Sequence, residues 1–284
     1  MATIINGKEV SARIRTELAQ ETAALREKGI VPGLAVIIVG DDPASRVYVN
    51  NKKKACAEIG YYSEELALPA DTTQDELLAH IAELSKRSDI NGILCQLPLP
   101  NGLDEHAVIA AIPPEKDVDA FHVQNTGHIM VGDYSFLPCT PAGVIALLDA
   151  YDIPIEGKNC VVIGRSNIVG KPMAMLLLHR NGTVTMCHSR TKDLAEFTRR
   201  ADIIVCSVGK AGFLTGDMVS DGAVVIDVGI NRNADGKLCG DVDYASVEPK
   251  CSAITPVPGG VGPMTIAMLM RNTLTAAKEQ NGLK

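Results

Sequence analysis

A chain of 284 residues with 46% hydrophobic and 21% charged residues has the balance of a soluble globular protein, and its length predicts two domains. The net charge of −7 argues against nucleic acid or an anionic membrane as the main partner. Residues 1–28 carry charges throughout and no window approaches the roughly 20 apolar residues of a membrane span, so we expect a cytoplasmic protein without a membrane anchor.

The first half of the chain predicts helices that alternate with buried strands. Val10–Lys28 has apolar residues at helical spacing, and Leu34–Val39 is a continuous apolar run of strand length. The pattern continues as helix, short strand, helix, strand and helix, over Ser45–Ile59, Leu66–Leu68, Asp75–Lys86, Gly92–Leu97 and Asp104–Ile112. This alternation is typical of a parallel sheet that is covered on both faces.

No clear period runs through Pro113–Pro138, and the alternation then resumes. Helices are predicted at Pro141–Ala150, Lys171–His179, Leu194–Arg200 and Thr265–Lys278, and strands at Asn159–Ile163, Thr183–Cys187, Asp202–Ser207 and Ala223–Val228. We therefore expect an α/β protein of two domains. Residues 139–264 form a Rossmann-type doubly wound parallel sheet. Residues 1–138, joined by a C-terminal helix at 265–284, form a second α/β domain with a mostly parallel sheet.

The eight cysteines give no sign of a metal site or of a disulfide framework. None are paired at C-x-x-C spacing, and the six histidines are scattered as well. In a cytoplasmic chain we expect these cysteines to be reduced and buried.

The segment that follows the Asn159–Ile163 strand has the order of a dinucleotide-binding turn. A Rossmann turn needs glycine for the tight bend and small residues where the backbone meets pyrophosphate. Gly164 meets the first need, Ser166 replaces the usual second glycine, and Gly170 falls one residue later than the usual third. The sequence therefore predicts a variant G-x-S-x-x-x-G cofactor loop.

The residues after the Thr183–Cys187 strand favour NADP over NAD. An NAD site places a carboxylate about 20 residues beyond the loop to hold the ribose hydroxyls, but no carboxylate precedes Asp193. Arg190, together with Arg165 in the loop, is suited to a 2′-phosphate, and the hydroxyl of Ser189 can donate a hydrogen bond to it. The alternative is that both arginines are ordinary surface residues.

Ser45, Tyr48 and Lys52 share one face of a predicted helix. This lysine stripe aligns a hydroxyl, an aromatic ring and an amine. A buried lysine loses its proton more easily and can act as a base, whereas an exposed lysine is only solvated surface. Two further segments can converge on this face. Gln96–Pro100 ends a strand at the presumed carboxyl edge of the first sheet, where α/β proteins bind ligands, and Lys116–Asp119 offers carboxylates that can accept hydrogen bonds from a ligand. The alternative for each segment is a structural turn.

Thr255–Thr265 holds three glycines and three prolines directly before the last predicted helix. Proline fixes φ and glycine allows close approach, so this rigid loop can present backbone N–H groups to a flat or anionic ligand. The alternative is a tight connection without a ligand.

Together these segments resemble the bifunctional methylenetetrahydrofolate dehydrogenase/methenyltetrahydrofolate cyclohydrolase family. The matching strings run along the whole chain: Tyr48-Val49-x-x-Lys52-x-Lys54-Ala55, Gln96–Pro100, Pro114–Asp119, Pro138–Pro141, Gly164-Arg165-Ser166-x-Ile168-Val169-Gly170-x-Pro172, Asp227–Asn231 and Thr255–Thr265. The resemblance implies that 5,10-methylenetetrahydrofolate is oxidised with NADP+ and that the methenyl product is hydrolysed to 10-formyltetrahydrofolate. It also implies a homodimer, small-molecule tetrahydrofolate substrates and no metal.

The resemblance also implies residue roles. It assigns the hydrolytic step to Lys52, with Gln96 as its tuning partner and Tyr48 packed on the folate. Asp119 then holds the pterin, and Ser45 joins the proton relay. The folate cleft is completed by Leu97, Pro258, Gly259, Gly260 and Pro263, and the NADP site consists of Gly164, Arg165, Ser166, Ser189, Arg190 and Ile230.

Three departures from the family pattern lie beside Asp119. Ala120 stands where glycine is usual, Val123-Gln124 replaces a proline-containing pair, and His128 replaces a common arginine. Two alternative functions remain open at this point: a dehydrogenase that lacks cyclohydrolase activity, and a nucleotide-binding protein of the same fold that has lost the chemistry.

Overall fold

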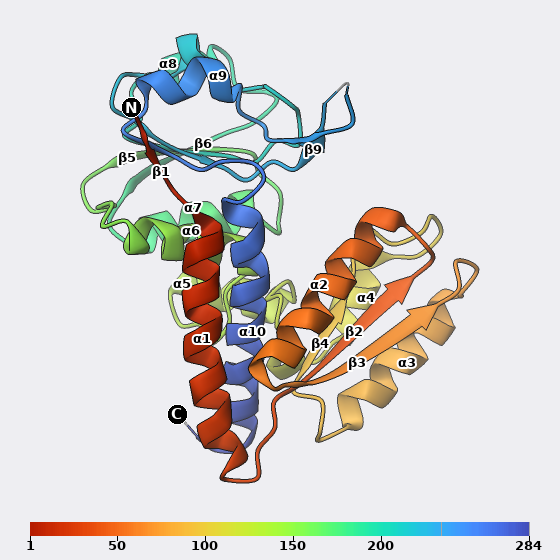
Figure 1. Ribbon diagram of the computed structural model, residues 1–284. Helices are drawn as coiled ribbons and strands as arrows, with labels where there is room; N and C mark the ends of the chain where they lie inside the picture. Colours follow the sequence, from red (N-terminus) through yellow and green to blue (C-terminus); the bar gives the residue numbers. More distant parts are fainter. Residues whose placement is uncertain (234, 284) are drawn as a thin grey trace. The chain divides into compact units, whose positions relative to one another are not determined.

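The computed structural model describes residues 1–233 and 235–283, which fold into two compact α/β units (Figure 1). We call them the six-stranded unit, made of Met1–Ser11 and Thr140–Thr265, and the three-stranded unit, made of Ala12–Cys139 and the chain from Ile266 onward. The N-terminus differs from the predicted boundary, because β1 (Thr3–Ile4) pairs with β11 (Ala253–Ile254) in the six-stranded sheet. Two-residue strands carry no periodic signal, so the sequence pattern did not reveal this pairing.

The six-stranded sheet is parallel throughout, in the order β1-β11-β8-β7-β5-β6. Besides β1 and β11, the sheet consists of β5 (Asn159–Ile163), β6 (Thr183–Cys187), β7 (Ile203–Cys206) and β8 (Val224–Asp227). In Figure 1, α6 (Cys139–Ala150) and α7 (Gly170–His179) lie on one side of this sheet, and α8 (Leu194–Thr198) and α9 (Tyr244–Val247) lie on the other. The doubly wound architecture is therefore confirmed.

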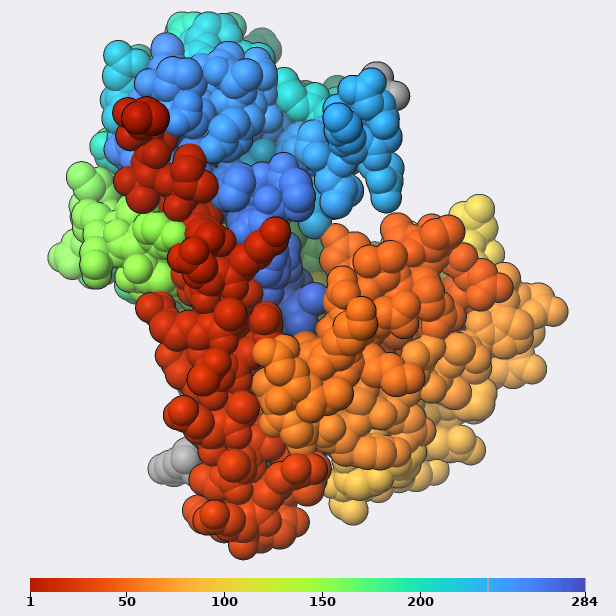
Figure 2. Space-filling view, in the orientation of Figure 1, coloured from red at the N-terminus to blue at the C-terminus, as the bar shows by residue number. Residues whose placement is uncertain are grey.

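The three-stranded sheet is also parallel, in the order β3-β2-β4. It consists of β2 (Gly33–Val39), β3 (Tyr62–Leu68) and β4 (Gly92–Cys95). All seven residues of β2 are buried, and alternate ones (Ala35, Ile37 and Val39) pack against α3 (Gln74–Lys86) and α4 (Glu105–Ala111). Alternation of side chains leaves the opposite face of the sheet for α2 (Pro43–Ile59), whose outer side lies at the surface in Figure 2.

Two long helices take part in both units along the chain. α1 (Gly7–Arg26) and α10 (Val261–Gln280) begin in the six-stranded unit and continue in the three-stranded unit. α10 starts four residues before the predicted Thr265. Pro263 is compatible with this early start because the first turn of a helix does not need its N–H groups.

Two elements differ most from prediction. β3 begins at Tyr62, four residues early, because Glu64 and Glu65 in this edge strand are paired with Arg87 and Arg46 and so hide the apolar pattern. The stretch read as aperiodic contains α5 (Val123–Val131). Further short elements that the pattern did not predict are β9 (Asn231–Arg232), β10 (Leu238–Cys239) and the 3-10 helices Pro114–Lys116, Gly216–Met218 and Glu248–Lys250.

The cysteines agree with their predicted state. All eight are free, and every one except the half-buried Cys239 is buried. Within the described ranges, no helix is long and apolar enough to cross a membrane.

Candidate active site

Lys52 owes its position to the way α2 is started and oriented. Asp42 caps the helix by accepting the N–H of Ser45 at 2.7 Å, and Pro43 begins its first turn. The buried residues of α2 recur at helical spacing: Ser45, Val49, Lys52, Ala55, Cys56 and Ile59. Lys52 thus lies on the apolar face of the helix, where its side chain is only 8% exposed.

The Lys52 amine is held by an amide from the neighbouring strand. Gln96 follows the end of β4, and its Oε1 accepts a hydrogen bond from Lys52 Nζ at 2.9 Å. The Gln96 Nε2 donates to the carbonyl of Leu97 at 2.6 Å, which fixes which end of the amide faces the lysine. The carboxyl edge of the three-stranded sheet therefore orients a buried amine.

Burial shifts the proton equilibria of Lys52 and Asp119 in opposite directions. Loss of hydration lowers the pKa of Lys52, and the nearby charge of Asp119 opposes this shift only in part. Loss of hydration likewise raises the pKa of Asp119, with the lysine opposing. The charges of the two groups therefore interact across a poorly hydrated space, and loss of hydration is the larger cause of both pKa shifts.

Two residues that the sequence reading did not assign support Asp119. Cys139 lies with its Sγ 3.4 Å from Asp119 Oδ1. The buried amide of Asn272 donates to the carbonyls of Val118 and Leu137, both at 2.8 Å. A signal for Asn272 was available, because it is a polar residue on the apolar face of the α10 helix pattern.

The turn beside Asp119 explains two of the three departures from the family pattern, those at Ala120 and at Val123-Gln124. Ala120 is 1% exposed and has φ +56°, the left-handed region that favours the glycine usual at this position. Val123 and Gln124 form the first turn of α5, which His122 caps by accepting the Gln124 N–H on Nδ1. Proline is also compatible with a first turn, so the substitution preserves this helix start.

Asp117 has a structural task in the same turn. Its Oδ2 accepts the N–H of His122 and the amide of Asn125, both at 2.8 Å. These bonds anchor the start of α5 and leave Asp119, two residues on, as the carboxylate near Lys52. The sequence left open which carboxylate of Lys116–Asp119 faces a ligand. In the structure, Asp117 holds the backbone of the turn and Asp119 lies near Lys52.

Tyr48 and Ser45, the other residues of the lysine stripe, lie on the same face of α2 as Lys52 but have different surroundings. Tyr48 is half-buried, and burial raises the pKa of its hydroxyl. Ser45 is buried and hydrogen-bonded to Asp42 at the start of the helix. Lys52 is thus hydrogen-bonded to Gln96 and is influenced by the charge of Asp119, whereas Ser45 donates its N–H to the N-cap residue Asp42.

The predicted cofactor turn has the close packing that such a loop needs. Gly164 has φ +129°, and a Cβ there would lie 2.4 Å from the carbonyl oxygen of Ser207. A Cβ at Gly170 would lie 2.4 Å from the Gly164 carbonyl oxygen. Ser166 Oγ accepts the N–H groups of Val169 and Gly170 at 3.2 and 3.3 Å, which closes the turn. A turn of this shape, directly before α7, suits the pyrophosphate of a dinucleotide.

Cationic and hydroxyl side chains surround that turn. Arg165 follows β5, and Ser189 and Arg190 follow the adjacent parallel strand β6, so all three lie at one edge of the sheet and all are exposed. In the part of the chain that the structure describes, neither guanidinium forms an ion pair with a protein carboxylate. Ile230, which is 48% exposed, lies beyond the end of β8 on the same sheet. These residues fit a dinucleotide that carries an additional phosphate.

The glycine-rich segment before α10 belongs to the six-stranded unit. Gly259 has φ +109°, and its carbonyl accepts the N–H of Lys8 at 3.2 Å. A Cβ at Gly7 would lie 1.8 Å from the Gly260 carbonyl oxygen, so this backbone packs directly on the start of α1. Pro258 is exposed and Pro263 is half-buried. Packing therefore accounts for part of the glycine content, and the exposed Pro258 remains accessible.

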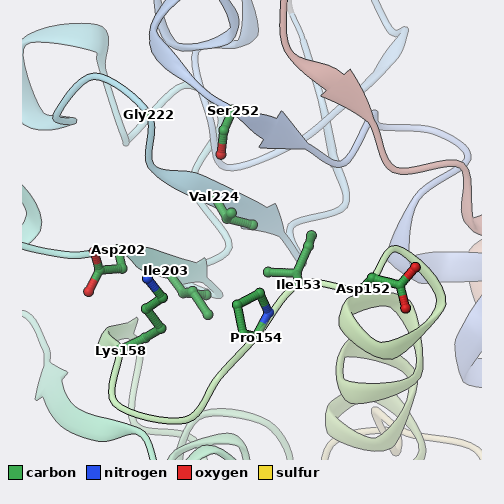
Figure 3. A pocket seen from close by; sticks show the side chains of 9 residues that line it. All are labelled: Asp152, Ile153, Pro154, Lys158, Asp202, Ile203, Gly222, Val224 and Ser252. Carbon is green, nitrogen blue, oxygen red and sulfur yellow. The ribbon is translucent and has the colours of Figure 1, made fainter.

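A hollow of about 250 Å³ lies at the opposite edge of the six-stranded sheet (Figure 3). Its lining includes Lys158, Asp202 and Ser252, which precede β5, β7 and β11 or begin them. Ligands of parallel α/β sheets bind at the carboxyl ends of the strands, so this hollow is not the cofactor site. Among the residues described in both units, no three His, Cys, Asp or Glu side chains are grouped for a metal ion.

Comparison with known proteins identifies relatives over the whole chain. The family model for the tetrahydrofolate dehydrogenase/cyclohydrolase catalytic domain matches residues 5–119, and that for the NAD(P)-binding domain matches residues 138–281. The bifunctional protein FolD of Acetivibrio thermocellus is 62% identical over 283 residues, which cover 100% of this chain and 99% of the relative.

Two solved structures show the same fold. The bifunctional enzyme FolD, a methylenetetrahydrofolate dehydrogenase/cyclohydrolase from Campylobacter jejuni, is 51% identical with a TM-score of 0.97, and the match covers 98% of this chain and 99% of that one. The N5,N10-methylenetetrahydrofolate dehydrogenase-cyclohydrolase of Trypanosoma brucei, complexed with NADP cofactor and an inhibitor, is 39% identical with a TM-score of 0.94 and covers 98% of each chain.

Proposed function

The chain belongs to the tetrahydrofolate dehydrogenase/cyclohydrolase family, and we propose that Lys52, Gln96 and Asp119 form the centre of its folate chemistry. The enzyme oxidises 5,10-methylenetetrahydrofolate to 5,10-methenyltetrahydrofolate with NADP+, and it hydrolyses the product to 10-formyltetrahydrofolate. The family resemblance read from the sequence is thereby confirmed.

The two units divide the work in this proposal. The six-stranded unit holds NADP+ with Gly164 and Ser166 at the pyrophosphate, and with Arg165, Ser189 and Arg190 at the 2′-phosphate. Ile230 is exposed beyond the end of β8 and is assigned to the same cofactor site. When bound, NADP+ accepts the hydride that leaves the methylene carbon of the substrate, so the protein mainly has to position the two molecules.

The three-stranded unit carries the hydrolytic step. Water adds to the methenyl carbon, and a base must take up a proton from that water as the new C–O bond forms. Lys52 suits this task, because burial lowers the pKa of its amine and a cationic substrate lowers it further. The hydrogen bond to Gln96 keeps the amine in one position while its protonation changes. As the bond between that carbon and N5 then breaks, N5 takes up the proton held by Lys52, the hydroxyl on the carbon loses its proton to solvent, and the formyl group remains on N10.

Binding of the pterin is assigned to Asp119 and the surfaces around it. A carboxylate can accept two hydrogen bonds from the amidine-like edge of a pterin. Asn272 holds the carbonyl of Val118, the residue before Asp119, and also that of Leu137, so the backbone that carries the acceptor is fixed. Tyr48 is the assigned stacking surface, and Leu97, Pro258, Gly259, Gly260 and Pro263 are assigned to the remaining folate contacts.

The observation that carries this assignment is the buried amine of Lys52, hydrogen-bonded to Gln96 and opposed by Asp119. We expect Lys52→Met to abolish hydrolysis of supplied methenyltetrahydrofolate and to retain part of the NADP+-dependent oxidation, so that the methenyl product accumulates. The measurement follows methenyl absorbance and NADPH separately. In the wild type, hydrolysis should rise with pH as the amine loses its proton, at a pH below the ordinary lysine pKa.

Lys53→Met is the matched control for this experiment. Lys53 is 62% exposed on the same helix and forms only a 3.7 Å ion pair with Glu65, which contributes little. Both activities should therefore remain at the wild-type level. A folded Lys52→Met protein that still makes 10-formyltetrahydrofolate at the normal rate would remove Lys52 from the mechanism. A wild-type protein that oxidises the substrate but never hydrolyses it would favour the dehydrogenase-only alternative.

We further propose that the enzyme acts as a homodimer in the cytoplasm. The family resemblance supports the dimer, and eight free cysteines agree with a reducing compartment. Light scattering on the purified protein tests the dimer by giving one or two chain masses of 30.1 kDa.

A further inference from the structure

Two buried carboxylates meet at the carboxyl edge of the six-stranded sheet. Asp227 ends β8 and is 4% exposed, and Asp241 follows β10 and is fully buried. The carboxylate of Asp227 accepts three backbone N–H groups, those of Gly229, Asp241 and Val242, at 2.9–3.0 Å. Asp227 thereby fixes the backbone that carries Asp241.

The carboxylate of Asp241 ties together the loops that follow two adjacent strands. It accepts the three successive N–H groups of residues 208–210, in the loop after β7, at 2.6, 2.9 and 2.8 Å. It also accepts the side-chain amide of Asn231, which begins β9 after β8, at 2.8 Å. Four donors on one carboxylate leave little freedom to either loop.

The first of these loops is in contact with the dinucleotide turn. Ser207 donates both its N–H and its hydroxyl to the carbonyl of Ile163, at 2.8 and 3.1 Å. The same residue lies where a side chain at Gly164 would stand, with 2.4 Å between the Ser207 carbonyl oxygen and that Cβ position. The second loop carries Ile230, the neighbour of Asn231 and 48% exposed. Both loops that Asp241 holds thus border the assigned cofactor site.

Glycines make the space for this arrangement. A Cβ at Gly229 would lie 2.3 Å from the carboxyl carbon of Asp241, and a Cβ at Gly240 would lie 1.8 Å from Asp227 Oδ2. Neither glycine has a left-handed φ, so close approach rather than backbone conformation excludes a side chain here. The two carboxylates, Asp227 and Asp241, therefore pack directly against the backbone of the two glycines, Gly229 and Gly240.

We propose that Asp241 is a positioning residue for NADP+ binding, which it serves by fixing the loops after β7 and β8 against the dinucleotide turn. This inference rests on the proposed assignment of the cofactor site. Asp241 itself is fully buried, so it acts without direct contact with the cofactor. Its effect is to remove loop motion before binding, so that the cofactor does not have to order the two loops itself.

The test compares Asp241→Asn with the matched control Asp243→Asn. In Asp241→Asn, an amide NH2 replaces one acceptor oxygen and faces backbone donors, so the loop loses bonds. We expect the Kd for NADP+, measured by calorimetry on the full-length protein at about pH 8, to rise about tenfold or more. Asp243 lies two residues away and bonds the Ser246 hydroxyl instead, so Asp243→Asn should bind NADP+ as the wild type does.

Two further readouts separate positioning from general damage. Hydrogen exchange at the amides of residues 208–210 should accelerate in Asp241→Asn and stay slow in the control. Hydrolysis of supplied methenyltetrahydrofolate without NADP+ should remain within about twofold of wild type, since Lys52 lies in the other unit. Exposed amides at residues 208–210 combined with unchanged NADP+ affinity would overturn the inference.

Asn231→Ala keeps the inference testable if Asp241→Asn does not fold. This variant removes only the Asn231 donor, and we expect about threefold weaker NADP+ binding. An unchanged Kd in a folded Asn231→Ala protein would count against the coupling of the second loop. Failure of the proposed function would look different, because the wild type itself would then bind no NADP+.

Discussion

The two assigned sites use charge in opposite ways. In the three-stranded unit, Lys52 is buried and Asp119 is half-buried, and loss of hydration is the main cause of the pKa shift of each. In the six-stranded unit, Arg165 and Arg190 are exposed and have no carboxylate partner among the described residues. Loss of hydration shifts the proton equilibria of the first two groups, whereas exposed cations suit the recognition of an anionic ligand.

The contrast has a physical consequence for mutations. Removing one partner of a buried pair leaves the other uncompensated in a poorly hydrated space, which is costly. Removing an exposed cation costs only its interaction with the ligand, and salt screens that interaction. The predictions below test this difference, in order of decreasing effect.

The largest effect is expected from Asp119→Ala. Loss of the carboxylate removes the assigned pterin acceptor and leaves Lys52 without its opposing charge, so the reacting carbon shifts relative to both reaction partners. Small misplacements of this kind cost on the order of 100-fold, and we expect such losses in both activities. Dissociation constants for folate and NADP+ are measured on the folded variant, and that for NADP+ should stay within about twofold. Folate affinity and both rates close to wild type would remove Asp119 from the site.

A smaller effect, confined to the cofactor, is expected from Arg190→Ala. The charged hydrogen bond to a 2′-phosphate is worth about 1.5–3 kcal/mol, and the exposure of Arg190 favours the lower end. The ratio of kcat/KM for NADP+ to that for NAD+ should therefore fall by roughly tenfold at low ionic strength and by less in high salt.

Arg200→Ala is the matched control for that prediction. Arg200 is equally exposed but precedes β7, at the edge of the sheet opposite the dinucleotide turn. Its removal should leave the NADP+ to NAD+ ratio unchanged. A wild-type enzyme that uses both cofactors equally would contradict the assignment of Arg165, Ser189 and Arg190 to the 2′-phosphate of NADP+.

The sequence predicted the long elements and the two sheets because their apolar periodicity is strong. β5 and β6 have the predicted bounds, and α7 differs by one residue. The failures have separate causes. Salt-bridged glutamates hid half of β3, and α5 lacks an apolar stripe, with Val123, Met130 and Val131 all exposed. Two-residue strands such as β1 are too short for a periodic pattern and are defined only by their pairing with a neighbouring strand.

The site was predicted in part for the same reason. The strand pattern placed Gln96 at the presumed carboxyl edge of the first sheet, whereas the grouping of Lys52, Gln96 and Asp119 was implied by the family resemblance. The contacts of Asn272 and Cys139 around Asp119 are tertiary, because they join residues 133 or more positions apart in the chain, or 20 apart with α5 between them. Nothing in local sequence encodes such partners. The N-cap of α2 is different, because Asp42 and Ser45 are three residues apart and such a cap is a local sequence signal.

Ala120 tests how closely the buried site holds its backbone. Its left-handed φ of +56° costs an L-residue about 1–2 kcal/mol, which Ala120→Gly would relieve. The same change loses a buried methyl group worth about 0.8 kcal/mol and gives the unfolded chain about 0.4–1 kcal/mol of additional entropy. These terms nearly cancel, so we expect the free energy of unfolding to change by less than about 1 kcal/mol. Denaturant titration measures it.

The control for this smallest effect is Ala276→Gly in α10. Ala276 is fully buried in a helix, so its replacement loses a methyl group and gains unfolded-state entropy with no strain to relieve. It should cost about 1–2 kcal/mol, clearly more than Ala120→Gly. If the two variants lose the same stability, the backbone at Ala120 is not strained. If instead Ala120→Gly is the more stable variant and keeps its folate affinity, the residue after Asp119 needs only the glycine-like conformation, and the buried site tolerates alanine there because its surroundings enforce that conformation.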